Sequence, residues 1–194
     1  MGTKKTRDRI LAGAADAFGT WGLTTTTVQQ ILEASKVSRR TFYQYYSSAE
    51  DVMSAVYDQH MDALLVHLAE GIQGAEGGQK VTQGLERWLS FQLEAGDLLI
   101  ALQAEAARPA SMLHARRERV LDTMVSTIVV SVKQALGVGL DPLVFRTVVL
   151  GLEGLVLYLH EQGQLADSRE RLGHLASGMF FSVLSQSSRW SVED

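Results

Sequence analysis

The stretch TTTTVQQILEASKVSRRTFYQYYSSAED, Thr24–Asp51, contains two helix start signals separated by a very short turn. Thr26 or Thr27 is followed three residues later by a glutamine, the pattern of a capping box at a helix N-terminus. Ser38 is a favourable N-cap for a second short helix. Because the first helix must end near Ser35, the two helices are joined by a tight turn, and the stretch predicts a helix-turn-helix.

The helix expected after the turn carries side chains that suit a polyanion. Arg39 and Arg40 lie in its first turn, where their charge adds to backbone N–H groups already suited to a phosphate. An arginine fork also binds guanine through two hydrogen bonds, and Gln44 can bind adenine in the same way. Tyr43 and Tyr45 offer hydroxyls to phosphates and ring faces to sugars or thymine methyls. The alternative is that the arginines form a solvated surface and the tyrosines simply pack.

The charge distribution agrees with a nucleic-acid partner at one end of the chain. The 194 residues carry a net charge of −4, yet residues 1–48 hold seven lysines and arginines against three acidic residues. A basic N-terminal quarter on an acidic body is expected when one end faces a polyanion. Chance clustering in a short window is the competing explanation.

The composition predicts a cytoplasmic all-α protein with no membrane partner. The chain has two prolines and no cysteine, which excludes disulfides and thiolate metal sites and suits a reducing compartment. Its most apolar stretch, 143–159, is interrupted by Arg146 and Glu153. Residues 1–10 do not have the pattern of a secretory signal.

Helical periodicity continues along the rest of the chain. A helix through Phe18 precedes the quoted stretch, and a long amphipathic helix starts near Ala49. Four glycines between Gly71 and Gly78 predict a connection. Further helices are expected at 79–95, 97–107, 109–136 (opened by Pro109), 142–162 and 168–188.

The segment 24–52 resembles the DNA-binding segment of the TetR family of bacterial transcription regulators. The family pattern is T-[TS]-[VM]-x-x-I-A-x-x-A-G-V-S-x-G-T-[LF]-Y-x-[YH]-F-x-S-K-E-x-L, and the resemblance covers about a quarter of the chain. Eleven matching positions carry it: Thr27, Val28, Ile31, Val37, Ser38, Thr41, Phe42, Tyr43, Tyr45, Ser48 and Glu50. The resemblance implies a three-helix helix-turn-helix DNA-binding domain at 1–48 and a larger helical effector-binding and dimerisation domain at 49–194.

The resemblance also implies roles for single residues. Phosphate contacts are expected at Thr27, Thr41, Tyr43 and Tyr45. Base-edge contacts are expected near Arg39, Arg40 and Gln44, with Gln29 as a further candidate. With the N-cap serine, the predicted DNA-binding residues are Thr27, Gln29, Ser38, Arg39, Arg40, Thr41, Tyr43, Gln44 and Tyr45. Four departures from the pattern bear on this prediction: a bulkier Leu32, a non-glycine Lys36 in the turn, an additional charge at Arg40, and Ala49 in place of a phosphate-binding lysine.

The helix after Pro142 is apolar on nearly every face and must be buried on more than one side. A partner subunit would supply the second burial, as the resemblance also implies, whereas a central core helix in a monomer is the alternative. The last helix supplies a second apolar stripe. The predicted homodimer interface comprises Phe145, Val149, Leu152, Val156, Leu159, Leu175, Met179 and Val183.

An effector pocket is expected on the helices that line the cavity in the family. The candidates are large apolar side chains together with two possible polar anchors, Gln92 and Glu105: Met61, Trp88, Phe91, Gln92, Leu102, Glu105, Met112 and Met124. The same stripe is more often plain core than pocket.

The sequence therefore predicts a homodimeric transcription regulator, a repressor released from a palindromic operator by a small-molecule effector. No residue pattern indicates a catalytic site, a metal site or a cofactor, so a non-enzyme is expected. The alternative function is a helical protein–protein interaction module that binds an acidic partner.

Overall fold

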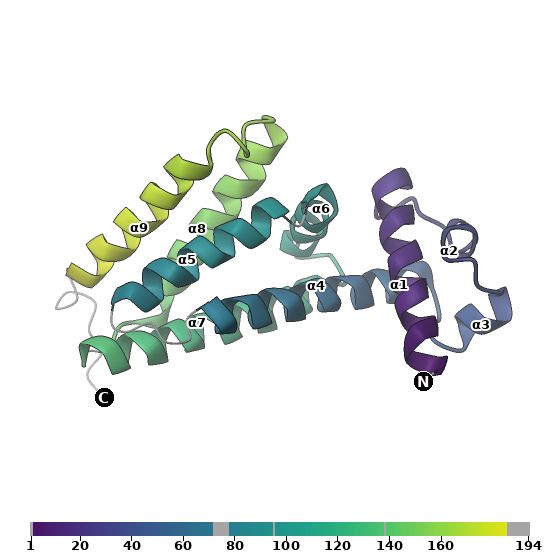
Figure 1. The fold of residues 1–194 in the computed structure, drawn as a ribbon, viewed down its shortest axis with the longest axis horizontal. Helices are drawn as coiled ribbons and strands as arrows, with labels where there is room; N and C mark the ends of the chain where they lie inside the picture. Colours follow the sequence, from purple (N-terminus) through teal and green to yellow (C-terminus); the bar gives the residue numbers. More distant parts are fainter. Residues whose placement is uncertain (1, 72–77, 95, 138, 186–194) are drawn as a thin grey trace. The chain divides into compact units, whose positions relative to one another are not determined.

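A computed structural model describes residues 2–71, 78–94, 96–137 and 139–185 of the chain. All regular elements in this part are helices, so the all-α prediction is confirmed (Figure 1). Their bounds are α1 Gly2–Trp21, α2 Val28–Ser35, α3 Arg39–Tyr43, α4 Ala49–Gly71, α5 Gly78–Glu94, α6 Gly96–Ala107, α7 His114–Leu136, α8 Pro142–Glu161 and α9 Arg169–Ser185. Most of the predicted connection between Gly71 and Gly78, and the end of the helix predicted at 168–188, lie outside the described residues.

The contacts divide the chain into two compact units. Unit 1 comprises Met1–Asp62 and Gly96–Arg116, and unit 2 comprises Ala63–Ala95 and Arg117–Asp194. Two of the three unit boundaries fall within α4 and α7, so both helices contribute residues to both units, and the third lies between α5 and α6. The functional division at residue 49 stays a prediction.

In unit 1, α1 packs closely against α2 through a glycine. A Cβ atom built on Gly13 would lie 2.4 Å from the backbone nitrogen of Ser35, so no larger residue fits without moving the helices apart. Ile10 and Phe18 of α1 and Ile31 of α2 are buried around this contact. At the end of α1, Gly22 has a φ of 88° and its N–H donates to the Phe18 carbonyl at 2.9 Å, which is the left-handed cap expected from the sequence.

The caps of α2 and α3 determine where these short helices begin. Thr27 is the N-cap of α2 and forms a capping box with Gln30, whereas the Thr26 hydroxyl donates to the carbonyl of Gly22 at 2.6 Å. Ser38 is the N-cap of α3, and its side chain accepts a hydrogen bond from the Thr41 N–H at 3.1 Å. Helices of eight and five residues are too short to be stable alone, so caps and core contacts hold them.

One predicted helix boundary is wrong. The helix predicted to start at Pro109 starts at His114, because Arg108–Leu113 form turns. The Ser111 N–H donates to the Arg108 carbonyl at 2.9 Å and the His114 N–H donates to the Ser111 carbonyl at 3.1 Å. Leu113 is fully buried, and this burial outweighs the helix-start preference of the proline.

Unit 2 is built around α8, which packs against α9. The rings of Phe145 and Phe180 lie 5.4 Å apart in this contact. By length and mean hydropathy α8 could cross a membrane. Its charged residues argue instead for a helix packed within the protein. Glu153 and Arg146 of α8 pair with Arg117 and Glu118 of α7, respectively. Ion pairs of this kind satisfy charges that lipid would leave unpaired.

The close approach at Gly13 yields a stability prediction. We expect Gly13→Ala to lower the free energy of unfolding by about 1–3 kcal/mol, because the new methyl group overlaps the Ser35 backbone. The matched control is Gly19→Ala in the same helix, where nothing lies within 4 Å of the added Cβ. That variant should gain up to about 1 kcal/mol from helix propensity. Urea denaturation of both variants tests this, and equal effects would contradict it.

Candidate functional site

Most residues predicted to contact DNA are exposed, and they lie at the start of α2 and in or beside α3. Thr27, Gln29, Ser38, Arg39, Arg40, Tyr43 and Gln44 are exposed, and Thr41 and Tyr45 are half-buried. The Tyr43 side chain is 50% exposed although its ring lies 5.3 Å from that of Phe42. The structure brings Arg39 beside Gln29 and Ser38 beside Thr41, and the contacts of all nine residues with DNA stay predictions.

The opposite side of α3 fixes this surface to the core of unit 1. Phe42 is fully buried and Tyr46 is nearly so, and their ring centroids lie 6.2 Å apart. Nε of Arg7 on α1 donates to the Tyr46 hydroxyl at 3.2 Å, and this bond, with the nearby phenol charge, raises the pKa of Arg7. A helix of five residues thus gains its orientation from two aromatic side chains and a contact with α1.

The turn between α2 and α3 contains the only positive φ outside glycine among the described residues. Lys36 has φ 54° and ψ 38°, and its N–H donates to the Leu32 carbonyl at 2.9 Å. Arg9 of α1 donates from Nη2 to the carbonyls of Ser35 at 3.2 Å and of Lys36 at 2.8 Å. These bonds offset the steric cost of a left-handed non-glycine residue.

Two candidate base-reading side chains contact each other before any DNA is bound. Nη2 of Arg39 donates to Oε1 of Gln29 at 3.0 Å, and Nε2 of Gln29 donates to Oε1 of Glu33 at 2.9 Å. This chain of side chains joins the first turn of α3 to α2. Glu33 was not among the predicted site residues, and its spacing of four from Gln29 on one helix face is the signal that could have found it.

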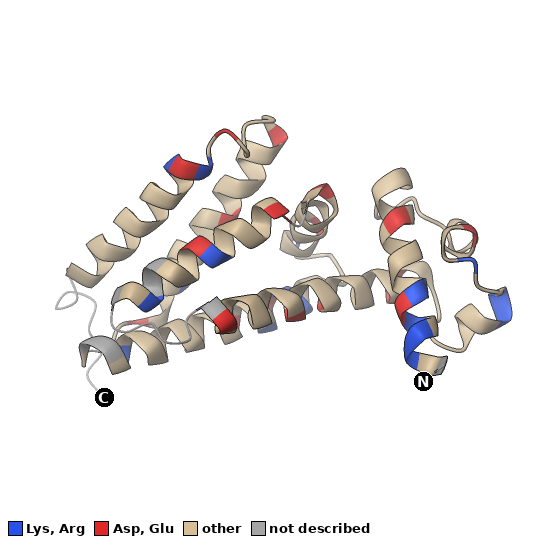
Figure 2. Ribbon diagram, viewed as in Figure 1, with Lys and Arg blue, Asp and Glu red and all other residues tan. Residues whose placement is uncertain are grey.

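Positive charge gathers near this surface. Figure 2 shows lysines and arginines in the N-terminal half of α1 and at the start of α3. The start of α4, where Ala49 stands in place of the family's lysine, is acidic instead. A backbone N–H of Glu50 and the Ser48 hydroxyl bind the Glu50 carboxylate and hold its pKa below its usual value. Phosphate contacts near α4 therefore depend on groups other than a lysine at position 49.

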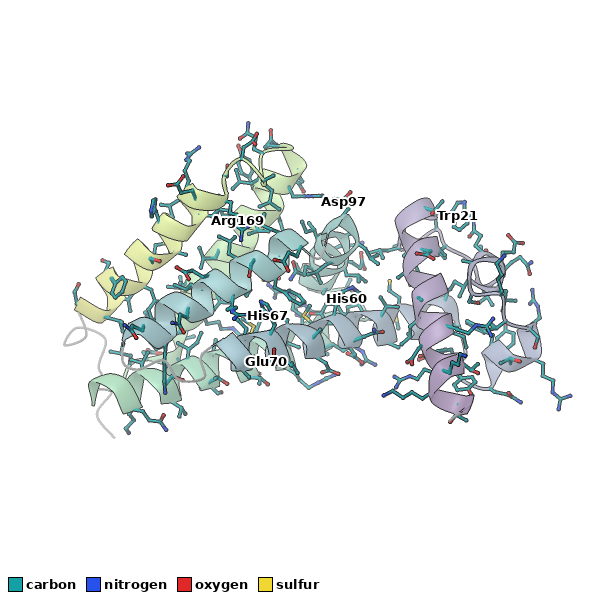
Figure 3. The ribbon with its side chains drawn as sticks, in the orientation of Figure 1. Trp21, His60, His67, Glu70, Asp97 and Arg169 are labelled. Atoms are coloured by element: carbon teal, nitrogen blue, oxygen red, sulfur yellow. The ribbon has the colours of Figure 1, made fainter. Side chains whose placement is uncertain are left out.

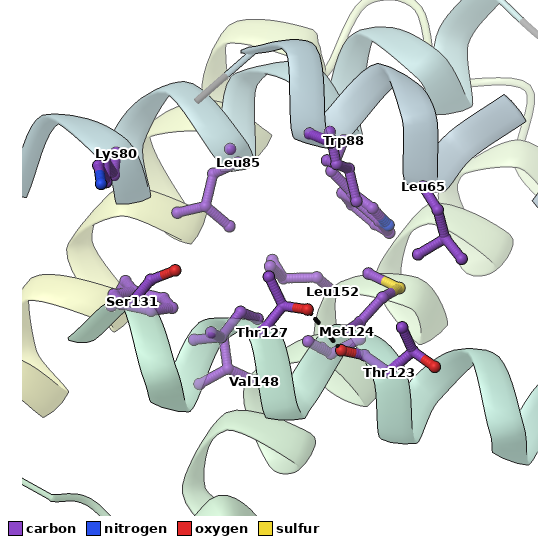
Figure 4. Close-up of a pocket in the computed structure, with 16 residues that line it drawn as sticks. Leu65, Lys80, Leu85, Trp88, Thr123, Met124, Thr127, Ser131, Val148 and Leu152 are labelled. Atoms are coloured by element: carbon purple, nitrogen blue, oxygen red, sulfur yellow. Dashed lines mark hydrogen bonds between the residues drawn. The ribbon is translucent and has the colours of Figure 1, made fainter. Parts of the chain in front are cut away.

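A cavity of about 320 Å³ lies entirely within unit 2 (Figure 4). It is lined by residues of α4, α5, α7, α8 and α9, and its size falls within the range of small-molecule sites. Its apolar wall includes Leu65, Leu85, Trp88, Met124, Leu152 and Phe180. Its described polar side chains are Lys80, Thr123, Thr127 and Ser131.

Two of the eight predicted pocket residues, Trp88 and Met124, line this cavity. Gln92 is buried in unit 2, and the Phe91 ring lies 5.8 Å from that of His67. The other four belong to unit 1, where they are buried (Met61, Leu102), ion-paired to Arg108 (Glu105) or exposed (Met112). Periodicity alone did not separate cavity wall from core, because both are apolar at helical spacing.

The predicted interface residues divide into two groups. Phe145, Leu152 and Val156 point into the interior of unit 2, where they are at most 4% exposed and unavailable to a partner. Leu175 and Met179 are exposed, and Val149, Leu159 and Val183 are half-buried. The sequence analysis missed the exposed apolar residues of α8 and α9, which are Leu143, Leu150, Tyr158 and Phe181.

Histidines do not build a metal centre in the described part of the chain. His60 and His67 lie along α4 (Figure 3), and His60 Nδ1 is 2.8 Å from the Val56 carbonyl. No group of three or more histidine, aspartate or glutamate side chains there is arranged to hold a metal ion.

Comparison with known proteins identifies the N-terminal region. Residues 10–56, which span α2, α3 and most of α1, match the family of bacterial regulatory proteins, tetR family. Residues 10–56 therefore carry a domain similar to the DNA-binding domain of the TetR family. The recognition made from the segment 24–52 is therefore confirmed.

Relatives with solved structures or curated descriptions extend the similarity beyond the TetR domain. The chain is 29% identical over 146 residues to the HTH-type transcriptional regulator TcmR of Streptomyces glaucescens, covering 71% of this chain and 63% of TcmR. A putative TetR-family transcriptional regulator from Syntrophomonas wolfei superposes with a TM-score of 0.75 at 16% identity, covering 93% of this chain and 95% of that one. The fatty acid degradation regulator FadR of Bacillus halodurans gives a TM-score of 0.71 at 18% identity, covering 88% and 97%. These two structures share the fold of this chain.

The turn at Lys36 yields a second prediction. We expect Lys36→Gly to raise the free energy of unfolding by about 0.5–1 kcal/mol, because glycine removes the left-handed strain but adds freedom to the unfolded chain. Lys36→Ala removes the same charge and keeps the strain, so it should bring no gain. Thermal and urea unfolding compare the two, and an equal gain in both would assign the effect to charge rather than to backbone conformation.

Proposed function

We propose that this protein is a sequence-specific DNA-binding transcription regulator, a repressor that leaves its operator when a small molecule binds. The observation that carries the proposal is the exposed surface of Arg39, Arg40, Tyr43 and Gln44 on a capped helix of a TetR-family domain. In a helix-turn-helix, such a helix enters the major groove with its N-terminal residues at the base edges.

The proposed roles on DNA follow from side-chain chemistry. Arg39, Arg40, Gln44 and Gln29 would meet base edges, because bidentate donors and acceptors distinguish base pairs in the major groove. The hydroxyls of Thr27, Thr41, Tyr43 and Tyr45 would bind phosphates, which fix the register without reading sequence. Ser38 would act mainly as the cap that holds α3 in place.

Homodimerisation is proposed from the exposed apolar faces of α8 and α9. Leu143, Leu150 and Tyr158 recur along α8, and Leu175, Met179 and Phe181 lie on α9. Gly151, Gly154 and Gly178 leave open space beside these faces, which permits close helix approach. A two-fold dimer would present two reading helices about 34–36 Å apart and so require a palindromic operator.

Control by an effector is proposed for the cavity of unit 2. A ligand there changes DNA affinity only if it binds two conformations of the protein unequally. Helices α4 and α7 are the proposed connection, since each contributes residues to both units. The role is that of a cytoplasmic regulator without enzymatic activity.

The decisive experiment is the selection of bound sequences from random duplex DNA with the purified full chain. We expect one enriched palindrome, bound with an affinity that falls steeply as salt increases. Binding of DNA without any sequence preference would overturn the proposal. If the protein bound no DNA but did bind an acidic protein, the result would favour the interaction module instead.

Variants separate base reading from phosphate binding. We expect Arg39→Ala and Gln44→Ala each to lose about 1–3 kcal/mol of discrimination at particular base pairs. Tyr43→Phe, which removes one hydroxyl, should weaken all sequences alike and leave the preferred site unchanged. Repeating the selection and the titrations with each variant tests this, and identical profiles for the two classes would refute the assigned roles.

The dimer has its own test. Leu175→Glu places a charge on the proposed interface, and we expect the variant to sediment as a monomer and to lose cooperative operator binding. The matched control is Val66→Glu, because Val66 is an equally exposed apolar residue of unit 2 away from α8 and α9. Dissociation of both variants, or of neither, would argue against this interface.

A further inference from the structure

The wall of the cavity in unit 2 excludes strongly polar ligands. Apart from its four polar side chains, the described lining consists of aliphatic and aromatic side chains and one glycine. A sugar or nucleotide would lose the hydrogen bonds of many groups to water and recover few of them here. The body of any well-bound ligand must therefore be apolar.

The two threonines of the lining have already used their hydroxyl protons. Oγ1 of Thr123 donates to the Arg119 carbonyl at 2.9 Å, and Oγ1 of Thr127 donates to the Thr123 carbonyl at 2.8 Å. Figure 4 draws the second of these bonds. These hydroxyls therefore offer lone pairs to a ligand and can only accept, which suits a weak donor on the ligand but gives no support to an anion.

Charge at the cavity is one-sided. Lys80 of α5 is the charged residue of the described lining, and no aspartate or glutamate is found among those residues. The side chain of Lys80 is half-buried, so its attraction for an anion is stronger than that of a surface lysine. A cationic ligand would meet this charge without any compensating carboxylate.

Besides the indole N–H of Trp88, the donors of the described lining lie at one end. In Figure 4, Lys80 and Ser131 flank the end of the cavity away from Trp88 and Leu65. Lys80 contributes an ammonium and Ser131 a hydroxyl to this end of an otherwise apolar lining. An anionic oxygen there would accept charge-assisted hydrogen bonds while the ligand body remains against the apolar wall.

We propose that this cavity binds an amphiphile with one anionic group, placed at Lys80 and Ser131, and an apolar body against Trp88, Met124 and Leu152. The inference rests on the proposed role of unit 2 as a sensor and names the chemical class of its effector. An aliphatic carboxylate and a fused aromatic acid share this chemistry.

The experiment compares ligands with the same apolar chain and different head groups. Decanoate, decanol and decyltrimethylammonium are titrated calorimetrically into the full chain below their micelle concentrations, with 2-naphthoate as the aromatic counterpart. We expect an anion to bind at least about tenfold more tightly than decanol, and the cation most weakly, from the difference of one charge-assisted contact. Tighter binding of decanoate identifies an aliphatic acid as the ligand class, and tighter binding of 2-naphthoate identifies a fused aromatic acid. Equal affinity for all head groups overturns the proposal.

Variants assign the preference to Lys80. Lys80→Gln should abolish the advantage of the anion and leave decanol binding unchanged, which also verifies that the variant is folded. Lys80→Arg should keep the advantage. Lys133→Gln, on α7 outside the described lining, is the matched control and should behave as the unaltered protein does. An unchanged preference in Lys80→Gln contradicts the proposed site.

Operator titrations separate this inference from the proposed function. If the selected anion binds and operator affinity stays constant, the ligand class holds and effector-controlled release fails. If the operator is bound with sequence preference and none of the probes binds, DNA recognition holds and the ligand class fails.

Discussion

The side chain of Arg9 donates hydrogen bonds to the carbonyls of Ser35, the last residue of α2, and of Lys36, and the turn that leads into α3 depends on this contact. It holds Lys36 in a left-handed conformation that glycine normally adopts, so the chain can reverse direction within three residues. From this turn follow the position of the Ser38 cap and the burial of Phe42. Arg39 and Gln44 are exposed on one surface because the opposite side of α3 is anchored in this way.

Much of unit 1 could be predicted from the sequence because its signals are local. Thr27 with Gln30 and Ser38 with Thr41 are caps formed within three residues, and they operate in the structure as the spacing indicated. Lys36, the non-glycine residue noted in the turn, is left-handed. The stabilising contacts of Arg9 could not be predicted from the sequence, because they join Arg9 to residues that lie 26 and 27 positions further along the chain.

The remaining differences have long-range causes. Pro109 suggested a helix start, but the burial of Leu113 decides the conformation of that segment. Phe145, Leu152 and Val156 were assigned to a partner interface because α8 is apolar all round. Which face turns inward is determined by α9 and by the ion pairs of Arg117 and Arg146 with α8 and α7, and a single helix carries no signal for that. The cavity wall is formed by residues of five helices, so the residue pattern of any single helix does not predict it.

The ion pairs of unit 2 explain why α8 keeps charges in an otherwise apolar helix. Glu153 and its partner Arg117 are both nearly buried, so loss of either residue would leave an unpaired charge in the interior. Arg146 contacts both Glu118 and Asp122, two positions one turn apart on α7. Directional contacts of this kind fix the register of α8 along the axis of α7. Apolar packing alone would define this register less strictly.

The cavity in unit 2 also links the stability of the protein to the chemistry of its surroundings. Side chains that line a cavity contact fewer protein atoms than those of an ordinary core, so a molecule that filled the cavity would add dispersion contacts there. Such a molecule binds the folded state alone. Because proteases act on the unfolded fraction, the cellular half-life of the chain would lengthen when that molecule accumulates. Under the proposed function, the same cavity would couple the abundance of the protein, as well as its conformation, to the supply of ligand.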